Sequence, residues 1–222
     1  MPHVLTMLQC PSCARRQEPR IICSQCGAPL AADLDLFAAL ELPRLLQIDI
    51  AELESAYHDL GRRIHPDHFA SAPPELRDAS LRATALVTRA YRTLRDPVSR
   101  GLYWLDLYGH KLAENNKQVP PDLAELVFEV QEQLSELRSA RGEQEAGTRE
   151  AIIDLRAKRA SLQGLMDELY AELVENFAGF DAGGGPDPDR LFAELKVILS
   201  KIAYLKTLLR DIDRELDGIK AE

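Results

Sequence analysis

Four cysteines with the spacing of metal ligands fall within the first 26 residues. They form two Cys-x-x-Cys pairs separated by nine residues, and the chain has no other cysteine. Two such turns bring four thiolates into a tetrahedron around one zinc ion, and Gly27 permits the tight backbone turn after the second pair. Two disulfides, idle thiols, and an iron or redox site are the alternatives. The sequence therefore predicts one structural zinc site with four ligands: Cys10, Cys13, Cys23 and Cys26.

The second candidate site is the tripeptide His65-Pro66-Asp67, which follows Arg62 and Arg63. Pro66 disfavours helical backbone at His65, so the preceding helix should end near Ile64 and present the imidazole and carboxylate on a loop. A metallohydrolase built from His65, Asp67 and His68 is one alternative. Such a site needs ligands that converge in a pocket, whereas these crowd one tip, so we expect no enzyme.

Two amphipathic helices position this tip. Pro73-Pro74 separates two stretches whose apolar residues recur at helical spacing, which predicts an antiparallel helical hairpin with the tip at its exposed end. A short helix capped by Asp33 and ended by Pro43 should precede the hairpin, and a helix over 98–108, carrying a core Trp104, should follow it. The expected buried stripes are Ile50, Leu53, Tyr57, Leu60 and Ile64 in the first stretch and Leu76, Ala79, Ala83, Leu86, Ala90 and Leu94 in the second.

Three longer helices follow a polar linker that ends in Pro120-Pro121. They are predicted over about 122–145, 148–178 and 188–220, with a glycine-rich break at 183–185 between the last two. Helices with such short connections favour an antiparallel three-helix bundle. The last helix has the most regular seam: Leu191, Leu195, Ile198, Ile202, Leu205, Leu209, Ile212, Leu216 and Ile219.

Two aromatic residues of the bundle fall outside the predicted core stripes. Phe128 points away from the stripe formed by Leu123, Val127, Val130, Leu134 and Leu137, toward a row of glutamates. Tyr204 falls opposite the seam, together with Val197, Lys201 and Leu208. Exposed aromatics ringed by carboxylates indicate a protein-docking patch. Packing against another part of the chain is the alternative.

The charge distribution excludes several classes of function. The formal net charge is −9, and residues 111–222 carry 15 basic against 23 acidic groups. An acidic chain of this kind binds nucleic acid poorly, although cysteine knuckles bind nucleic acid in some proteins. No apolar run is long enough to cross a bilayer, and residues 1–9 lack the features of an export or import signal. We expect a cytoplasmic protein without a nucleic-acid or membrane partner.

The hairpin with its His-Pro-Asp tip resembles the J-domain of DnaJ-type co-chaperones. Leu36-Phe37, Phe69-Ala70, the segment from Ala90 to Pro97, and a continuation to Tyr108-Gly109 are similar to the iron–sulfur co-chaperone family HscB. The resemblance covers roughly residues 33–220. It implies an all-α protein with three parts: a zinc-binding segment (1–32), a J-domain (33–109) and a C-terminal three-helix bundle (110–222).

The resemblance also implies partners and roles. An HscA- or DnaK-type chaperone would dock at Arg62, Arg63, His65, Pro66 and Asp67 and be stimulated to hydrolyse ATP. The IscU-type scaffold, on which iron–sulfur clusters are assembled, would dock on the bundle. The family's docking positions fall on Ala124, Glu125, Phe128, Glu129, Glu132, Glu136 and Tyr204.

One departure from the family lies in this docking edge. Ala124-Glu125-Leu126 stands where Leu-Met-Glu is usual, which implies a smaller and more acidic edge. A J-domain co-chaperone for a different client is therefore the main alternative. The sequence leaves open the role of the knuckle, the oligomeric state, the angle between J-domain and bundle, and the chaperone paralogue.

Overall fold

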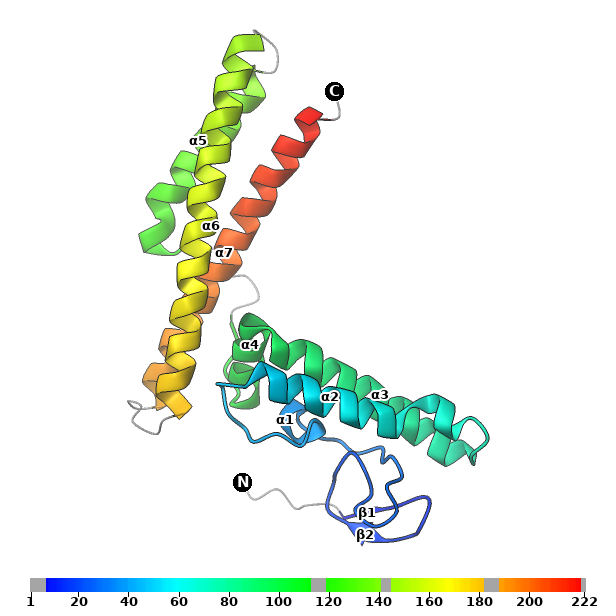
Figure 1. Cartoon of the computed structure of the whole chain (residues 1–222). Helices are drawn as coiled ribbons and strands as arrows, with labels where there is room; N and C mark the ends of the chain where they lie inside the picture. The colour runs from blue at the N-terminus through cyan, green and yellow to red at the C-terminus, as the bar shows by residue number, and fades with distance from the viewer. Residues whose placement is uncertain (1–6, 113–118, 141–144, 182–187, 221–222) are drawn as a thin grey trace. The chain divides into compact units, whose positions relative to one another are not determined.

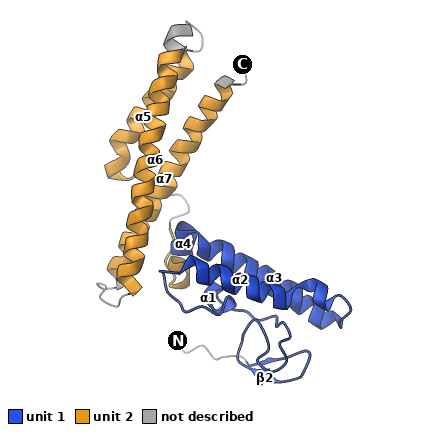
Figure 2. Ribbon diagram, viewed as in Figure 1, with its two compact units in different colours: residues 1–103 blue, residues 104–222 orange. Residues whose placement is uncertain are grey.

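The computed structural model describes residues 7–112, 119–140, 145–181 and 188–220. The chain divides into two compact units, residues 1–103 and 104–222 (Figure 2). Helices dominate both units, which confirms the predicted all-α class. Residues 113–118 of the predicted polar linker and the glycine-rich break at 183–185 lie outside the described residues. No helix within the described ranges combines the length and apolarity needed to cross a membrane.

The N-terminal segment folds as two knuckles beside a minimal sheet. Strands β1 (Leu8–Gln9) and β2 (Arg16–Gln17) pair antiparallel, an addition to the predicted all-helical fold. Gly27 adopts a φ of +73°, the left-handed conformation that a glycine reaches without strain. The buried residues of this segment form a small core with Leu76 of the hairpin packed against it: Cys10, Cys23, Ala28 and Leu30.

Helix α1 (Leu36–Ala39) is a single turn whose boundaries differ from the prediction. Asp35 rather than Asp33 caps it, accepting hydrogen bonds from the N–H groups of Phe37 and Ala38 at 2.9 Å. The helix ends before Pro43, because Glu41 takes a φ of +57°. The proline is therefore not what stops it.

Two helices form the predicted hairpin (Figure 1): α2 (Ile50–Ile64), capped by Asp49, and α3 (Pro74–Arg95). Helix α2 ends at Ile64, as Pro66 predicted. Between the helices lies η1 (Pro66–Phe69), a turn of 3-10 helix where a plain loop was expected. The expected stripes are not wholly buried. Ile50 of α2 is 39% exposed, and in α3 Leu76 and Leu86 are half-buried, whereas Val87 is buried. Helix α4 (Pro97–Leu107) follows directly.

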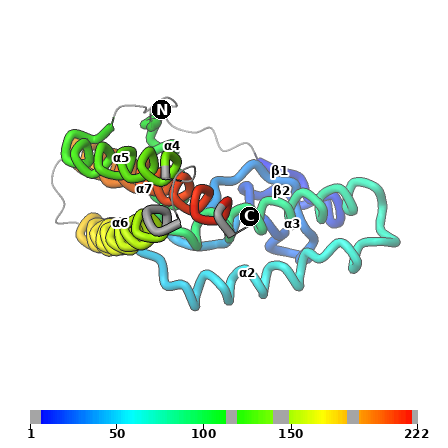
Figure 3. Tube along the Cα trace, turned by 90° about the horizontal axis from the view of Figure 1, so that it is seen from above, coloured from blue at the N-terminus to red at the C-terminus, as the bar shows by residue number. Residues whose placement is uncertain are grey.

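The second unit is built on α5 (Ala124–Ala140), α6 (Glu145–Asp181) and α7 (Pro188–Lys220), with η2 (Pro121–Leu123) leading into α5. The three helices lie side by side as a bundle (Figure 3). Every member of the predicted seam of α7 is buried except Ile219, whose side chain lies outside the described residues. The buried stripe of α5 also matches the prediction, although Val127 is half-buried.

The end of α4 and the residues after it pack on the bundle hairpin. Trp104 is 2% exposed, which confirms its predicted core role, and its ring meets Phe180 of α6 edge-on at 5.7 Å. Tyr108 and His110 lie against Phe192 of α7 at ring-centroid distances of 5.4 and 4.1 Å. These aromatic contacts lie at the end of α6 and the start of α7.

Candidate functional sites

The four cysteine sulfurs form a site that fits one metal ion. All four Sγ atoms lie within 4.8 Å of one another, and they are the only group of three or more metal-ligating side chains gathered among the described residues. Cys10 and Cys26 are 3.6 Å apart and Cys13 and Cys23 are 3.7 Å apart, while none is in a disulfide. Tetrahedral zinc with bonds of about 2.3 Å separates its sulfurs by about 3.8 Å, which these distances match.

Backbone groups of the second knuckle favour thiolate at one ligand. The N–H groups of Cys26 and Gln25 hydrogen-bond to Cys23, and they lower the pKa of its thiol to about 6. The pKa of Cys13 moves the other way. The Arg15 N–H lowers it, but burial and hydrogen bonds with the other sulfurs outweigh that and raise it to about 12. Metal ligands bind as thiolates, so an ion must displace the proton that Cys13 otherwise retains.

The His-Pro-Asp tip is an exposed and internally capped turn. The His65 Nδ1 atom accepts a hydrogen bond from the Asp67 N–H at 3.3 Å, and the His65 carbonyl accepts one from His68 at 3.0 Å. The imidazole and the Asp67 carboxylate are 52% and 88% exposed, 3.5 Å apart. The imidazole therefore lies between the backbone and the carboxylate of Asp67, and it caps the turn.

Two hydroxyl groups of α3 hold the helix end from which the tip projects. The buried Ser80 Oγ donates to the Ile64 carbonyl at 2.6 Å, and Thr84 Oγ1 donates to the same oxygen at 3.4 Å. The last carbonyls of a helix have no partner within the helix, so these bonds satisfy one of them and fix its position. Sequence reasoning missed both residues. The available signal was a serine that follows Ala79 within an apolar stripe.

The residues beside the tip form an exposed surface that carries positive charge. Arg62 and Arg63 lie exposed in the last turn of α2, and Arg62 forms an ion pair with Asp59. A cavity of about 430 Å³ lies between α2 and α3 at this end, with Tyr57, His65 and Thr88 among its lining residues. His65, Asp67 and His68 do not form one of the metal-ligating groups gathered among the described residues.

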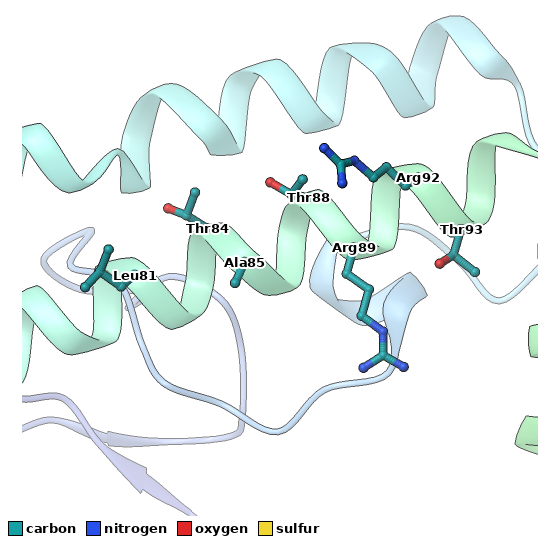
Figure 4. Close-up of a pocket in the computed structure, with 7 residues that line it drawn as sticks. All are labelled: Leu81, Thr84, Ala85, Thr88, Arg89, Arg92 and Thr93. Atoms are coloured by element: carbon teal, nitrogen blue, oxygen red, sulfur yellow. The ribbon is translucent and has the colours of Figure 1, made fainter.

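An open groove of about 550 Å³ lies along α3 (Figure 4). Thr84 and Thr88 point toward α2, whereas Arg89 extends to the other side of the helix. Small side chains at Thr84, Ala85 and Thr88 create the depression between Leu81 and the arginines. The groove consists of one helix surface, and it has no buried polar group aimed into it.

The docking residues predicted on the bundle lie on α5 and α7. Phe128 is 68% exposed, the highest value among the large apolar side chains described, and Tyr204 is half-buried. Ion pairs join Asp122 to Lys201 and Arg138 to Glu215, so α5 and α7 run parallel and Tyr204 lies level with the first turn of α5. The parallel course brings both aromatics to the same part of the bundle.

The acidic members of this face differ in their surroundings. Glu125, Glu132 and Glu136 are exposed, as is Ala124. Glu129 is instead half-buried, because its carboxylate pairs with Lys158 of α6 at 2.5 Å. Leu208, which was expected beside Tyr204 on the outer face, is buried, because α7 packs against α5 on this side as well as against α6.

Known proteins resemble this chain over most of its length. The human protein named iron–sulfur cluster co-chaperone protein HscB is 34% identical over 196 residues, which cover 86% of this chain and 74% of that protein. A co-chaperone protein HscB homolog of Ralstonia nicotianae is 30% identical over 184 residues, 82% of this chain and 94% of that protein. No family model matches.

Solved structures agree with these sequence comparisons. The crystal structure of human HscB superposes with a TM-score of 0.67 at 27% identity, covering 93% of this chain and 97% of that one. The Vibrio cholerae chaperone HscB superposes with a TM-score of 0.60 over 84% and 99% of the two chains, and at 22% identity it supports the fold alone. Together with the exposed His-Pro-Asp turn, the helical bundle and the gathered cysteines, this similarity shows that the chain belongs to the HscB family of co-chaperones.

Proposed function

We propose that this co-chaperone stimulates the ATPase of an HscA- or DnaK-type chaperone and delivers an IscU-type iron–sulfur scaffold to it. The observation that carries the proposal is the capped, exposed turn at His65, Pro66 and Asp67. Its backbone is restricted by Pro66, and the helix end before it is held by Ser80 and Thr84. A turn that is ordered before docking loses little conformational entropy when the chaperone binds.

The arginines beside the turn supply the attraction to the chaperone. Arg62 and Arg63 present planar guanidinium groups, which suit carboxylates on a partner surface. In this proposal the arginines set the rate and orientation of encounter, whereas the His65–Asp67 turn makes the contact coupled to ATP hydrolysis. The chain performs no chemistry itself. It supplies a docked geometry in which the chaperone's own ATPase is faster.

The client side of the proposal uses the outer face of α5 and one aromatic of α7. Phe128 and Tyr204 would provide the buried anchors of the interface, surrounded by Ala124, Glu125, Glu129, Glu132 and Glu136. Carrying the client and the chaperone contact on one chain raises their effective concentration for each other. The functional division at residues 109 and 110 remains part of this proposal, as does a cytoplasmic location.

The test is an ATPase assay with purified chaperone, with and without purified IscU-type scaffold. The co-chaperone alone should raise the steady-state rate several-fold, and the scaffold should raise it further. Stimulation that the scaffold does not change, together with no binding of scaffold in titration, would favour a different client. Absence of any stimulation would reject the chaperone role.

The cysteine site is proposed to hold one structural zinc ion through Cys10, Cys13, Cys23 and Cys26. When bound, zinc would cross-link the two knuckles without performing catalysis, since four thiolates leave no open position. Leu76 packs against this cluster, so the metal would also support the start of α3.

Metal analysis should find about one zinc per chain. Chelation should then lower the thermal stability of residues 7–103 while leaving the fluorescence of Trp104, which lies in the other unit, unchanged. Zinc-free protein with two intact disulfides, or protein carrying iron, would overturn the assignment.

A further inference from the structure

The bundle carries a groove that no role described above uses. It has a volume of about 510 Å³ and lies between the segment leading into α5 and the middle of α7. Val119, Pro120 and Pro121 form one wall, and Lys196, Val197 and Lys201 form the other. The groove is therefore mainly apolar, with ammonium groups along one side.

The walls of the groove are fixed in place. Pro120 and Pro121 have restricted backbone angles, and the Pro120 carbonyl accepts a hydrogen bond from the Leu123 N–H at 2.8 Å. The ion pair between Asp122 and Lys201 joins the two walls directly. A partner that binds here would meet a surface that needs little reordering, which favours affinity.

An apolar side chain faces this groove without being covered. Val197 is 52% exposed, whereas its neighbours Leu195 and Ile198 are buried in the seam of α7. A β-branched residue in the middle of a helix is rigid, so it presents a defined apolar surface at low entropic cost. Val197 therefore fits an apolar side chain from a partner.

The charges of the groove indicate what should flank that side chain. Asp122 neutralises Lys201, whereas Lys196 forms no ion pair with any residue that the structure describes. Lys196 is half-buried, and an ammonium group beside an apolar groove favours a carboxylate partner. The α5 face has the opposite sign, because Glu125, Glu132 and Glu136 are exposed there.

The groove is continuous with the docking face proposed above. Val197, Lys201 and Tyr204 are spaced four and three residues apart on α7, so they follow one another along the same side of the helix. We propose that the groove is a second subsite for the client protein and takes an apolar side chain flanked by a carboxylate. The inference rests on the proposed function, since the client is the scaffold that docks at Phe128 and Tyr204.

The test is calorimetric titration of the full chain with purified IscU-type scaffold protein. Val197→Glu places a carboxylate in the apolar part of the groove and should weaken binding about tenfold, a typical loss for a residue at the centre of an interface. Lys196→Glu should weaken binding about threefold and make the dissociation constant less sensitive to salt. Ile153→Glu is the matched control, because Ile153 is similarly exposed but lies on α6 away from the groove.

The outcomes distinguish a failure of the proposed subsite from a failure of the proposed scaffold docking. Weakening by Val197→Glu with unchanged binding by Ile153→Glu supports the subsite. Normal binding by Val197→Glu, when Phe128→Ala weakens it, rejects the subsite and leaves the proposed function standing. Normal binding by both variants rejects docking on this face and the subsite with it. Circular dichroism and Trp104 fluorescence verify that each variant is folded, and Val197→Ser provides a milder substitution if Val197→Glu is not.

Discussion

The tip at His65 and the outer face of α5 are both exposed and charged, but the chain builds them differently. At the tip, an imidazole caps the turn and two hydroxyl groups bind one carbonyl, so the positions of the atoms depend on one another. On α5 the docking side chains project from a regular helix, and among its four glutamates only Glu129 is paired with another helix in the part of the chain that the structure describes. Losing one group should therefore disable the tip, whereas the α5 face should lose affinity in steps.

The sharpest test of this contrast is His65→Gln, which should abolish stimulation of the chaperone ATPase. Glutamine has no ring nitrogen at the position that accepts the Asp67 N–H, so both the cap and the imidazole surface are lost. Steady-state ATP hydrolysis measures the effect, and circular dichroism should show unchanged helix content. His110→Gln makes the same exchange away from the tip and should stimulate normally. Full stimulation by His65→Gln would show that the turn is not the coupling contact.

A large but graded loss is expected on α5 and α7. Phe128→Ala combined with Tyr204→Ala should weaken scaffold binding about 100-fold, since two aromatic anchors are typically worth about 3 kcal/mol together. Each single variant should weaken binding by a smaller factor. Titration calorimetry provides the measurement, and Leu81→Ala, another exposed apolar residue that lies in the other unit, is the control. Complete loss from either single variant would mean that this face is as interdependent as the tip.

Ser80→Ala tests whether the tip depends on the hydrogen bond from α3 to the end of α2. The substitution removes the 2.6 Å hydrogen bond to the Ile64 carbonyl and leaves only the longer bond from Thr84. Losing one buried hydrogen bond costs about 1–2 kcal/mol. We expect a several-fold higher co-chaperone concentration for half-maximal ATPase stimulation, with unchanged scaffold binding.

Ser139→Ala is the control for this substitution, because its hydroxyl also binds a helix carbonyl but on the exposed surface of α5. Equal effects of the two serine variants would show that Ser80 has no particular connection to the tip.

The sequence predicted the structure well where the residue type or spacing determines the local backbone conformation. Pro66 predicted the end of α2 at Ile64, and the cysteine spacing predicted four sulfurs close together. Hydrophobic periodicity predicted the seam of α7 because the pattern is long. The choice of Asp35 over Asp33 as a cap was beyond reach, since both are capping residues and the decision depends on where Phe37 packs.

Hydrogen bonds and ion pairs between residues far apart in the sequence could not be predicted either. The bonds from Ser80 and Thr84 to Ile64 join positions 16 and 20 residues apart, and the pairing of Glu129 with Lys158 spans 29. Periodicity assigns a face to each residue but does not identify the partner across the interface. The exposure of Phe128 followed from its angle on one helix, whereas the half-burial of Tyr204 depends on how α5 lies beside α7.

The smallest expected effect concerns the pH dependence of the bundle near the base of α5. Lys201 donates a hydrogen bond to the Asp122 carboxylate and thereby holds the pKa of Asp122 below its ordinary value of 3.8, although partial burial opposes this. A lowered pKa in the folded state means that the charged form is favoured by folding. The resulting stability is fully present above the ordinary pKa and is lost as the pH falls through the lowered one.

Asp122→Asn should therefore lower the free energy of unfolding at pH 7 by less than about 1 kcal/mol, because the pair is partly exposed to solvent. The difference from the unsubstituted chain should shrink below pH 4. Urea unfolding followed by fluorescence of the buried Trp104, which belongs to the same unit, measures both quantities. Asp154→Asn, at an exposed position on α6, should give no such difference at either pH. A deficit for Asp122→Asn that persists at low pH would mean that the carboxylate supports the bundle through packing rather than charge.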